Sequence, residues 1–509
     1  MSFTGPPASP QAPAEGPPAA FPVPQPAAAG SRTSKGLLAV AIALLIVGAA
    51  AGLGYATFDS GPQVPGTWDP RVASIAAFVE AARGLRYEHP VRVYFLTPSE
   101  YSLAINGERT SAGSAASKAR AKRTAAFERA IGFVQGEPDV EKAAGDLADS
   151  GTLAYYDFDR KIVNIRGTKL TVNTRVTLAH ELTHALQDQQ FDLSSRFGAG
   201  NSEQQQALRT IVEGDAMTVE NRYIDTLTED EKTAYRTEYQ AVYDKSQQDL
   251  GQVATALQAS QTIPYAIGQP YVGFVQATRG GQPDTARLDA LMRRLPQDTA
   301  ATFDPADASG LRVDVEPPRL SGITFTVDQV GAFSLYVMLS DRIDATSAMD
   351  AVDGWRGDAF RAAETKTTGA KTTGAKTVMC VAATFAMAST NDAKELNEAF
   401  SQWAAAMPDP AAITHTTTGR RVSLKTCDPG PTATAPGAIG KSSDALALPS
   451  NRLDLAEVLV TQGSSRPKAL CGADKIVREL TPSELTGGSV SDERKTEIQQ
   501  LLKGAAEKC

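Results

Sequence analysis

The segment His180-Glu181-Leu182-Thr183-His184 places the tightest constraint on the fold, because its two histidines can act together only on a helix. Residues four apart on a helix differ by about 40° in direction and by one turn in height. Both imidazoles can therefore reach one metal ion at about 2.0–2.1 Å. Glu181 lies beside that line, where it could take a proton from a water at the metal. The pattern H-E-x-x-H thus predicts a helical metal site with an adjacent general base.

A third metal ligand must come from elsewhere in the chain, because catalytic zinc takes three protein ligands and keeps one position open. No third histidine follows at the spacing H-E-x-x-H-x-x-G-x-x-H, since residues 187–190 are Gln-Asp-Gln-Gln. A glutamate on a following helix is the other common solution, and Glu213 lies in the apolar segment Ile-Val-Glu-Gly-Asp-Ala. Glu203, at the expected helix start, and Glu220, two turns after Glu213, are weaker candidates.

Several segments together resemble the gluzincin class of zinc metallopeptidases, typified by thermolysin, and more closely a group of membrane-anchored bacterial metallopeptidases found especially in actinobacteria. The resemblance covers about residues 75–430 and rests on TLAHELTHALQDQQFDL and IVEGDA, supported by FVEAARGLRYEHPVRVYFL, LAYYDFDRKIVNIRG, PYAIGQPYVGFV and DGWRGDAF. It implies a zinc-dependent hydrolase with Zn²⁺ as cofactor, held by His180, His184 and Glu213, and with Glu181 as catalytic base. It also implies that residues 152–156 form an edge strand that pairs with the substrate backbone.

Thermolysin-like enzymes carry an aspartate one turn after the third ligand, where it orients a histidine, but Met217 stands there in this chain. Asp215 and Asp188 are the remaining candidates for that role. The transition state also needs a hydrogen-bond donor for its oxyanion. Four side chains are candidates for this donor: Tyr223, Tyr265, Tyr271 and His415.

An apolar run precedes all of these residues. Leu37–Phe58 spans 22 positions without a charge, and about 20 apolar residues suffice to cross a bilayer. Arg32 and Lys35 precede the run, so the positive-inside rule puts the N-terminus in the cytoplasm. A cleaved signal peptide is the rival interpretation, but its apolar region would be shorter and nearer the N-terminus. We expect a single-pass anchor in the cell membrane, with the catalytic part extracytoplasmic.

All four cysteines lie on the predicted outer side, and an even number there indicates disulfides. No C-x-x-C spacing suggests that they bind a metal. The stretch 428–450 is rich in Pro, Ala, Thr, Gly and Ser and separates Cys380 and Cys427 from Cys471 and Cys509. We therefore expect the pairs Cys380–Cys427 and Cys471–Cys509.

The expected fold class is α+β: a mainly helical zincin-like domain with a small sheet, preceded by one transmembrane helix and followed by α/β segments. Alternating β-prone runs predict a hairpin over 152–166, and helical spacing predicts helices over about 173–190, 203–226 and 228–258, with a break at 262–265. The expected divisions run in chain order as follows: disordered Pro/Ala-rich tail 1–35, transmembrane helix 36–58, linker 59–70, metallopeptidase domain 71–320, C-terminal α/β subdomain 321–430, linker 431–450 and small helical segment 451–509.

The formal charge of −8 comes without any cluster of Lys and Arg, which argues against nucleic acid as a partner. The leading hypothesis is a metallopeptidase that acts on peptide or protein substrates in the cell envelope. A peptidoglycan peptide hydrolase would use the same chemistry. A catalytically inactive membrane-anchored scaffold is a further alternative, although it would have no chemical need for Glu181. A purely structural zinc site would have a fourth protein ligand and no open position.

Overall fold

The computed structural model describes residues 64–106, 115–149, 152–294, 297–307, 312–367, 376–437, 439–480 and 482–485, most of 491–500, and Cys509. The predicted tail and transmembrane helix lie outside these residues. Within the described part of the chain, no helix is both long enough and apolar enough to cross a bilayer.

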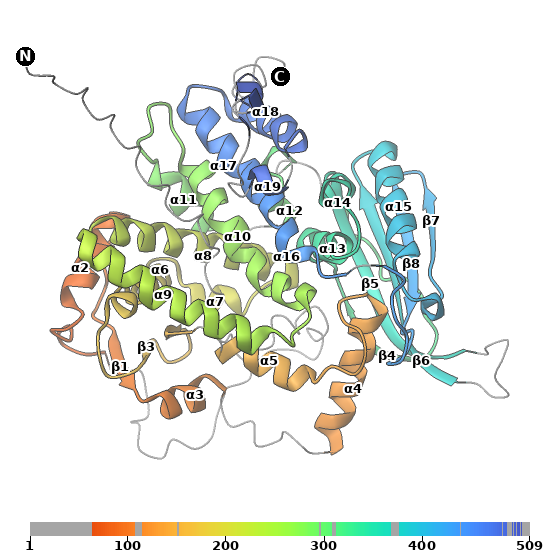
Figure 1. The fold of residues 1–509 in the computed structure, drawn as a ribbon, viewed down its shortest axis with the longest axis horizontal. Coiled ribbons are helices and arrows are strands. Elements are labelled where there is room, and N and C mark those ends of the chain that lie inside the picture. Colours follow the sequence, from red (N-terminus) through yellow and green to blue (C-terminus); the bar gives the residue numbers. More distant parts are fainter. Residues whose placement is uncertain are drawn as a thin grey trace, which may run out of the picture.

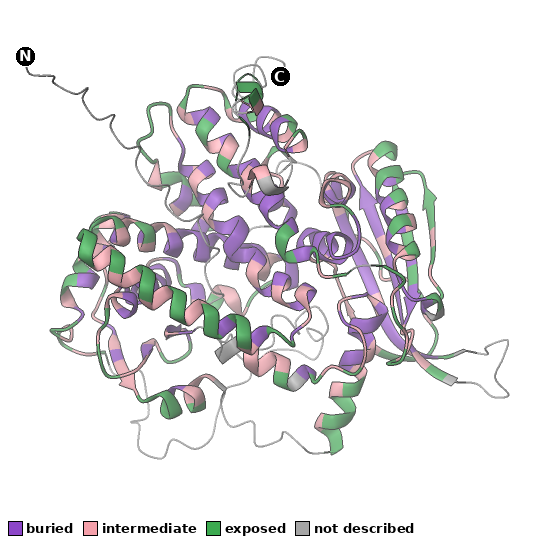
Figure 2. Cartoon of the chain, viewed as in Figure 1, coloured by how far each residue is buried: buried purple, intermediate pink, exposed green. Residues whose placement is uncertain are grey.

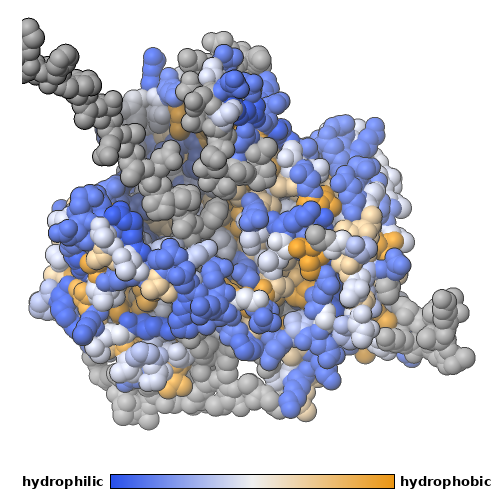
Figure 3. Space-filling model, viewed as in Figure 1, coloured by the Kyte–Doolittle hydropathy of each residue, from blue (hydrophilic) through white to orange (hydrophobic). Residues whose placement is uncertain are grey.

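The protein is a mixed α/β protein, mainly helical, with two small sheets (Figure 1). The first part of the chain is mostly helical and holds these helices: α2 Ala73–Arg83, α3 Pro98–Asn106, α4 Ala115–Ala130, α5 Val140–Asp149, α6 Val172–Phe191, α7 Leu193–Phe197, α8 Ser202–Asp225, α9 Glu229–Leu250, α10 Thr255–Gln276, α11 Thr285–Met292 and α12 Ala300–Phe303. Buried residues concentrate on α6, α8 and α10 in this part (Figure 2). The surface over α9 is hydrophilic (Figure 3).

The first sheet has three strands in the order β1-β3-β2, with bounds Arg92–Leu96 for β1, Ala154–Asp157 for β2 and Ile162–Arg166 for β3. β2 and β3 are antiparallel, which confirms the predicted hairpin, and β1 runs parallel to β3. β2 is an edge strand of this described sheet. Lys161 donates its N–H to the carbonyl of Asp157, and Arg166 donates its N–H to that of Leu153. The backbone groups of successive residues in a strand point alternately to its two sides. Since Leu153 and Asp157 bond toward β3, the backbone N–H and C=O of Tyr156 point away from it.

Helices α6 and α8 begin at side-chain caps close to the predicted starts. Thr171, rather than Asn173, caps α6 by accepting the N–H of Thr174. Asn201 caps α8 in a capping box with Gln204. Such caps satisfy N–H groups that the first helical turn leaves without partners. The two caps fix where each helix begins and therefore which side chains face each other between α6 and α8.

The predicted break at 262–265 is wrong. The helix expected over 228–258 divides instead between α9, which ends at Leu250, and α10, which begins at Thr255 and continues through Pro264 and Pro270. A proline inside a helix removes one backbone hydrogen bond and usually bends or ends the helix. Here α10 is largely buried against α8 and α17, and this packing outweighs the local cost.

The second sheet is antiparallel and has the order β4-β5-β6-β8-β7. Its strands are β4 Ile323–Asp328, β5 Trp355–Thr367, β6 Lys376–Met387, β7 Thr414–Thr418 and β8 Arg421–Cys427, and its helices are α13 Gly331–Ser340, α14 Ala345–Val352 and α15 Thr390–Ala405. The sheet and these helices lie on the right in Figure 1. Cys380 of β6 faces Cys427 of β8 in register, and the two form a disulfide.

The remaining helices are α16 Ser442–Ala445, α17 Ala447–Thr461, α18 Arg466–Arg478 and α19 Pro482–Leu485. Cys471 of α18 forms the second disulfide with Cys509, so both bonds join the pairs expected from the sequence. Helices α16 and α17 begin within 431–450, which we had predicted to be a linker, and Ser442 is buried at the start of α16. The linker is therefore shorter than its composition indicated.

Helices α8 and α10 touch backbone to backbone at two glycines. A Cβ on Gly214 would lie 2.1 Å from the carbonyl oxygen of Gly268, and a Cβ on Gly268 would lie 2.4 Å from the carbonyl oxygen of Thr210. These distances are far below contact distance, and backbone atoms on a packed helix cannot move aside as a flexible side chain can. Glycine is therefore required at both positions for the helices to pack this closely.

We expect Gly214→Ala to lower the free energy of unfolding by about 3 kcal/mol, because the added methyl forces α8 away from α10. Chemical denaturation of the full chain measures the change. Gly251→Ala is the matched control, since Gly251 has a helical φ of −60° and a Cβ there would meet only ordinary contacts at 3.4 Å. Equal stability of the two variants would contradict the proposed role of the close approach.

Candidate metal centre

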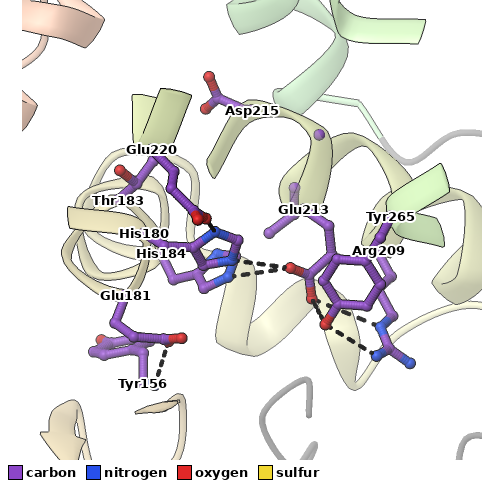
Figure 4. Close-up of polar contacts among 12 residues, drawn as sticks. Tyr156, His180, Glu181, Thr183, His184, Arg209, Glu213, Asp215, Glu220 and Tyr265 are labelled. Carbon is purple, nitrogen blue, oxygen red and sulfur yellow. Dashed lines mark hydrogen bonds and ion pairs between the residues drawn. The ribbon is translucent and has the colours of Figure 1, made fainter. Parts of the chain in front are cut away.

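Three side chains from two helices meet in the interior of the first part. Helix α6 contributes His180 and His184, α8 contributes Glu213, and all three are buried (Figure 4). Their potential ligand atoms lie within 4.8 Å of one another. The sequence predicted each of these residues as a ligand, and the helix pair brings them together.

The spacing of the donor atoms suits one small cation. The Oε2 atom of Glu213 lies 3.3 Å from Nε2 of His180 and 3.4 Å from Nε2 of His184. Two ligands at tetrahedral angles and about 2.05 Å from a common zinc ion would be about 3.3 Å apart. Both distances between the carboxylate and the imidazoles therefore fit a tetrahedral metal.

The other ring nitrogens of both histidines have partners that only accept. Nδ1 of His180 lies 2.9 Å from Oε2 of Glu220. Nδ1 of His184 lies 3.0 Å from Oε1 of Gln187, whose amide nitrogen donates to Asp215 and to the carbonyl of Val212. Each Nδ1 therefore donates its proton to that acceptor, so Nε2 is the atom of each ring that would bind a metal, once it has given up any proton that it carries.

The bonds behind His184 continue as a buried chain. Oδ2 of Asp215 accepts from Gln187 at 2.7 Å and from Nε of Arg83 at 2.8 Å. Arg83, on α2, also pairs with Asp289 of α11 at 2.7 Å. Asp215, predicted as a residue that orients a histidine, thus acts on His184 through Gln187 rather than by direct contact.

Glu181 points toward the edge strand of the first sheet (Figure 4). Its Oε2 atom accepts the backbone N–H of Tyr156 at 2.7 Å. Burial raises the pKa of Glu181 to about 7, although the neighbouring histidines oppose the rise. A carboxyl group with a pKa near neutrality can both accept and return a proton, which is the property of a general acid–base.

The third side of the cluster is formed by Tyr265 of α10 and Arg209 of α8. The hydroxyl of Tyr265 donates to Oε1 of Glu213 at 3.1 Å, and Nε of Arg209 lies 3.7 Å from the same oxygen. Burial alone would raise the pKa of Glu213, but the adjacent histidines outweigh it and hold the pKa below its usual range. Burial alone would likewise lower the pKa of His180, but hydrogen bonds to Glu213 and Glu220 raise it to about 10.

Other predicted residues lie away from the metal ligands. Asp188 accepts from Tyr156, Lys161 and Ser194, so it anchors the hairpin to α6 rather than orienting a histidine. Glu203 lies on α8, ten residues before Glu213, and its carboxylate accepts hydrogen bonds from Thr299. The ring of Tyr223 packs against Phe78, Tyr271 is buried on α10, and His415 lies on β7 beside Asn397. Of the four tyrosine and histidine candidates, Tyr265 is the one that hydrogen-bonds to a proposed ligand, Glu213.

Sequence reasoning missed part of the surrounding network. Glu220, considered only as a weaker ligand, lies seven residues after Glu213 and therefore on the same face of α8, a spacing that could have suggested a supporting role. Gln187 lies three residues after His184, within reach along one helix. Arg83 is 132 residues from Asp215 in the sequence, so no local pattern could have predicted that contact.

Comparisons with known proteins bear on a different part of the chain. A family model described as a domain of unknown function (DUF8575) matches residues 321–432. This segment contains the five-stranded sheet with α13–α15, and none of the residues of the candidate metal centre. No curated protein gives a significant match to the chain. No solved structure gives one either.

We expect Asp215→Asn to lower the free energy of unfolding by about 3 kcal/mol, because the amide keeps the shape but removes a charge that compensates buried Arg83. Asp289→Asn is the matched control, since Asp289 pairs with the same guanidinium but its side chain is 14% exposed. Urea unfolding of both variants tests the difference. If Asp289→Asn lowers the free energy of unfolding as much as Asp215→Asn, the buried pair of Asp215 with Arg83 contributes no more to stability than the partly exposed pair with Asp289.

Proposed function

We propose that this chain is a zinc-dependent metallopeptidase, anchored in the cell membrane, whose domain over 71–320 hydrolyses peptide bonds outside the cytoplasm. The observation that carries the proposal is the buried cluster of His180, His184 and Glu213 with Glu181 beside it. Three protein ligands leave a position for water and substrate, whereas a structural zinc site would be closed by a fourth ligand. No other His, Cys, Asp or Glu group of this kind occurs in the described part of the chain.

The donor set favours zinc over the harder divalent cations. Two neutral imidazoles and one carboxylate suit Zn²⁺, whereas Mg²⁺ and Ca²⁺ prefer oxygen ligands throughout. Glu220 and Gln187 hold the imidazole rings so that both Nε2 atoms face Glu213. When bound there, zinc would supply Lewis acidity for attack on the scissile carbonyl.

The chain's own residues would perform the proton transfers. Glu181 would take the proton of the attacking water and later deliver it to the leaving amine. Tyr265 and Arg209 hold Glu213 in place through Oε1. The hydroxyl of Tyr265 already has a partner in Glu213, so its first role would be to position that ligand.

The edge of β2 offers a place for the substrate backbone. The backbone groups of Tyr156 on this edge face away from β3, and its N–H reaches Glu181. An extended peptide that pairs with this edge would run past Glu181 and the metal ligands, by the strand addition that many peptide-binding proteins use. Such pairing recognises the main chain of any peptide, so side-chain specificity must come from other contacts.

We expect Glu181→Gln to reduce peptide hydrolysis by at least about 100-fold while zinc content stays near that of the native chain, because the general base is lost but no ligand is. His184→Ala and Glu213→Ala should lower zinc content as well as activity. Metal analysis of the purified full-length chain and cleavage of a peptide library supply the two measurements.

Two outcomes would contradict the proposal in different ways. If Glu213→Ala keeps full zinc and activity, the third ligand has been assigned wrongly. If the native chain binds zinc but Glu181→Gln causes no measurable loss of peptide cleavage, an inactive scaffold explains the molecule better. A library that includes peptidoglycan stem peptides distinguishes a wall hydrolase from a general peptidase.

The proposed location has support from the cysteines. Both disulfides form between residues of the part placed outside, and such bonds persist mainly in oxidising compartments. We expect an alkaline phosphatase fused after Cys509 to be active, because that reporter needs an oxidising environment. The same reporter joined in front of Met1 of the otherwise full-length chain should be inactive. Activity of the second fusion alone would reverse the proposed orientation.

A further inference from the structure

A partly open cavity of about 60 Å³ lies where the N-terminal helices meet the segment matched by the family model. One wall comes from α4, α8 and α10, and the other from α13, β5 and β6. Its lining is mainly apolar and includes Phe127, Leu257, Phe333 and Val337, and it contains none of the proposed metal ligands. Small-molecule sites are typically concave, mostly apolar and located at such junctions, with a few polar groups that fix the ligand.

Glu128 of α4 places a carboxyl group in this apolar lining. The residue is 3% exposed, and its Oε2 atom has no hydrogen-bond partner among the described residues. The neighbouring cation does not compensate it, because Arg129 forms a two-pronged pair with Asp428 at 2.7 and 2.8 Å. Burial raises the pKa of Glu128 to about 8. An unpaired buried carboxyl group is costly to the fold, so its presence requires an explanation.

A second acceptor in the lining is also unpaired. The Oε1 atom of Gln206, on α8, is buried without a partner among the described residues. Glu203 lines the same cavity, but Thr299 donates to its carboxylate through both N–H and Oγ1. Two oxygens on residues of the lining therefore lack a donor in the described part of the chain, one of them on an acid, and a ligand that satisfies them must donate hydrogen bonds.

We propose that this cavity binds the ammonium end of a primary alkylamine, either a free amine or the side chain of a lysine. An ammonium group has three donors and no acceptor, so after pairing with Glu128 it would still have donors for Gln206. Its positive charge compensates the buried acid, and the attached methylene groups contact Phe127 and Phe333. A dry cavity of about 150 Å³ accommodates benzene, so 60 Å³ suits the ammonium group and the first few carbons.

The test compares ligands of equal length that differ in the head group. We expect n-butylamine to raise the unfolding temperature of the full-length chain, and to bind at least tenfold more tightly than 1-butanol in titration calorimetry. Glu128→Gln should abolish that preference while leaving the weak binding of butanol. Glu137→Gln, which removes the same charge from an exposed position shortly after α4, is the matched control and should bind the amine as the native chain does.

Two further measurements, the stability of Glu128→Gln without ligand and amine binding by Gln206→Leu, test the same site. Glu128→Gln without ligand should unfold at a higher temperature than the native chain, because folding near neutral pH must either protonate the buried Glu128 or bury its charge without a counter-ion, and an amide has neither cost. If that variant fails to fold, Gln206→Leu removes the other acceptor and should weaken amine binding at least threefold. Binding of Nα-acetyl-lysine methylamide in place of butylamine would identify a lysine side chain as the source. Equal affinity for butylamine and butanol, or a preference that survives in Glu128→Gln, would overturn the proposal.

Discussion

The geometry of the candidate metal centre depends on how closely α8 approaches its neighbours, and three consecutive residues of that helix set the approach on three sides. Glu213 faces the histidines of α6. Gly214 allows α10 to touch the backbone, at a position where any Cβ would collide with Gly268. Asp215 accepts from Gln187 and Arg83. A shift of α8 along any of these contacts would move Glu213 relative to both imidazoles, so packing and site geometry are one constraint.

Local patterns in the sequence predicted the elements of this site well, because they depend on spacing within a helix. The positions of His180, Glu181 and His184 follow from helical geometry, and the hairpin before them follows from alternating β-prone residues. Asn173 lies two residues after the actual cap, because the hydroxyl of Thr171 can accept a backbone N–H as an asparagine carboxamide oxygen does, and it stands earlier in the chain. Such errors of one or two residues are expected at helix ends and do not change which face carries the histidines.

Contacts between distant segments were beyond local patterns. Nothing near Arg83 indicates that it reaches Asp215, and the prolines of α10 suggested a break because local propensity ignores burial against α8 and α17. The prediction of a linker over 431–450 was wrong at its end for a similar reason. Its composition is that of a loop, but Ser442 and residues 445–450 are buried. Tertiary packing determines the structure at each of these positions, and a short stretch of sequence does not show which distant segments will pack against it.

Buried carboxyl groups show how the fold separates structural acids from candidate functional ones. Glu203 receives two hydrogen bonds from Thr299, and Asp215 receives bonds from Gln187 and Arg83, so both have protein partners. Among the described residues, Glu181 has a single hydrogen bond, from the backbone of the edge strand β2, and Glu128 has none. Leaving such groups without partners lowers stability. Glu181 and Glu128 are the two least satisfied of these four acids, and they are the two for which we propose an external partner: a peptide with its attacking water for Glu181, and an ammonium group for Glu128.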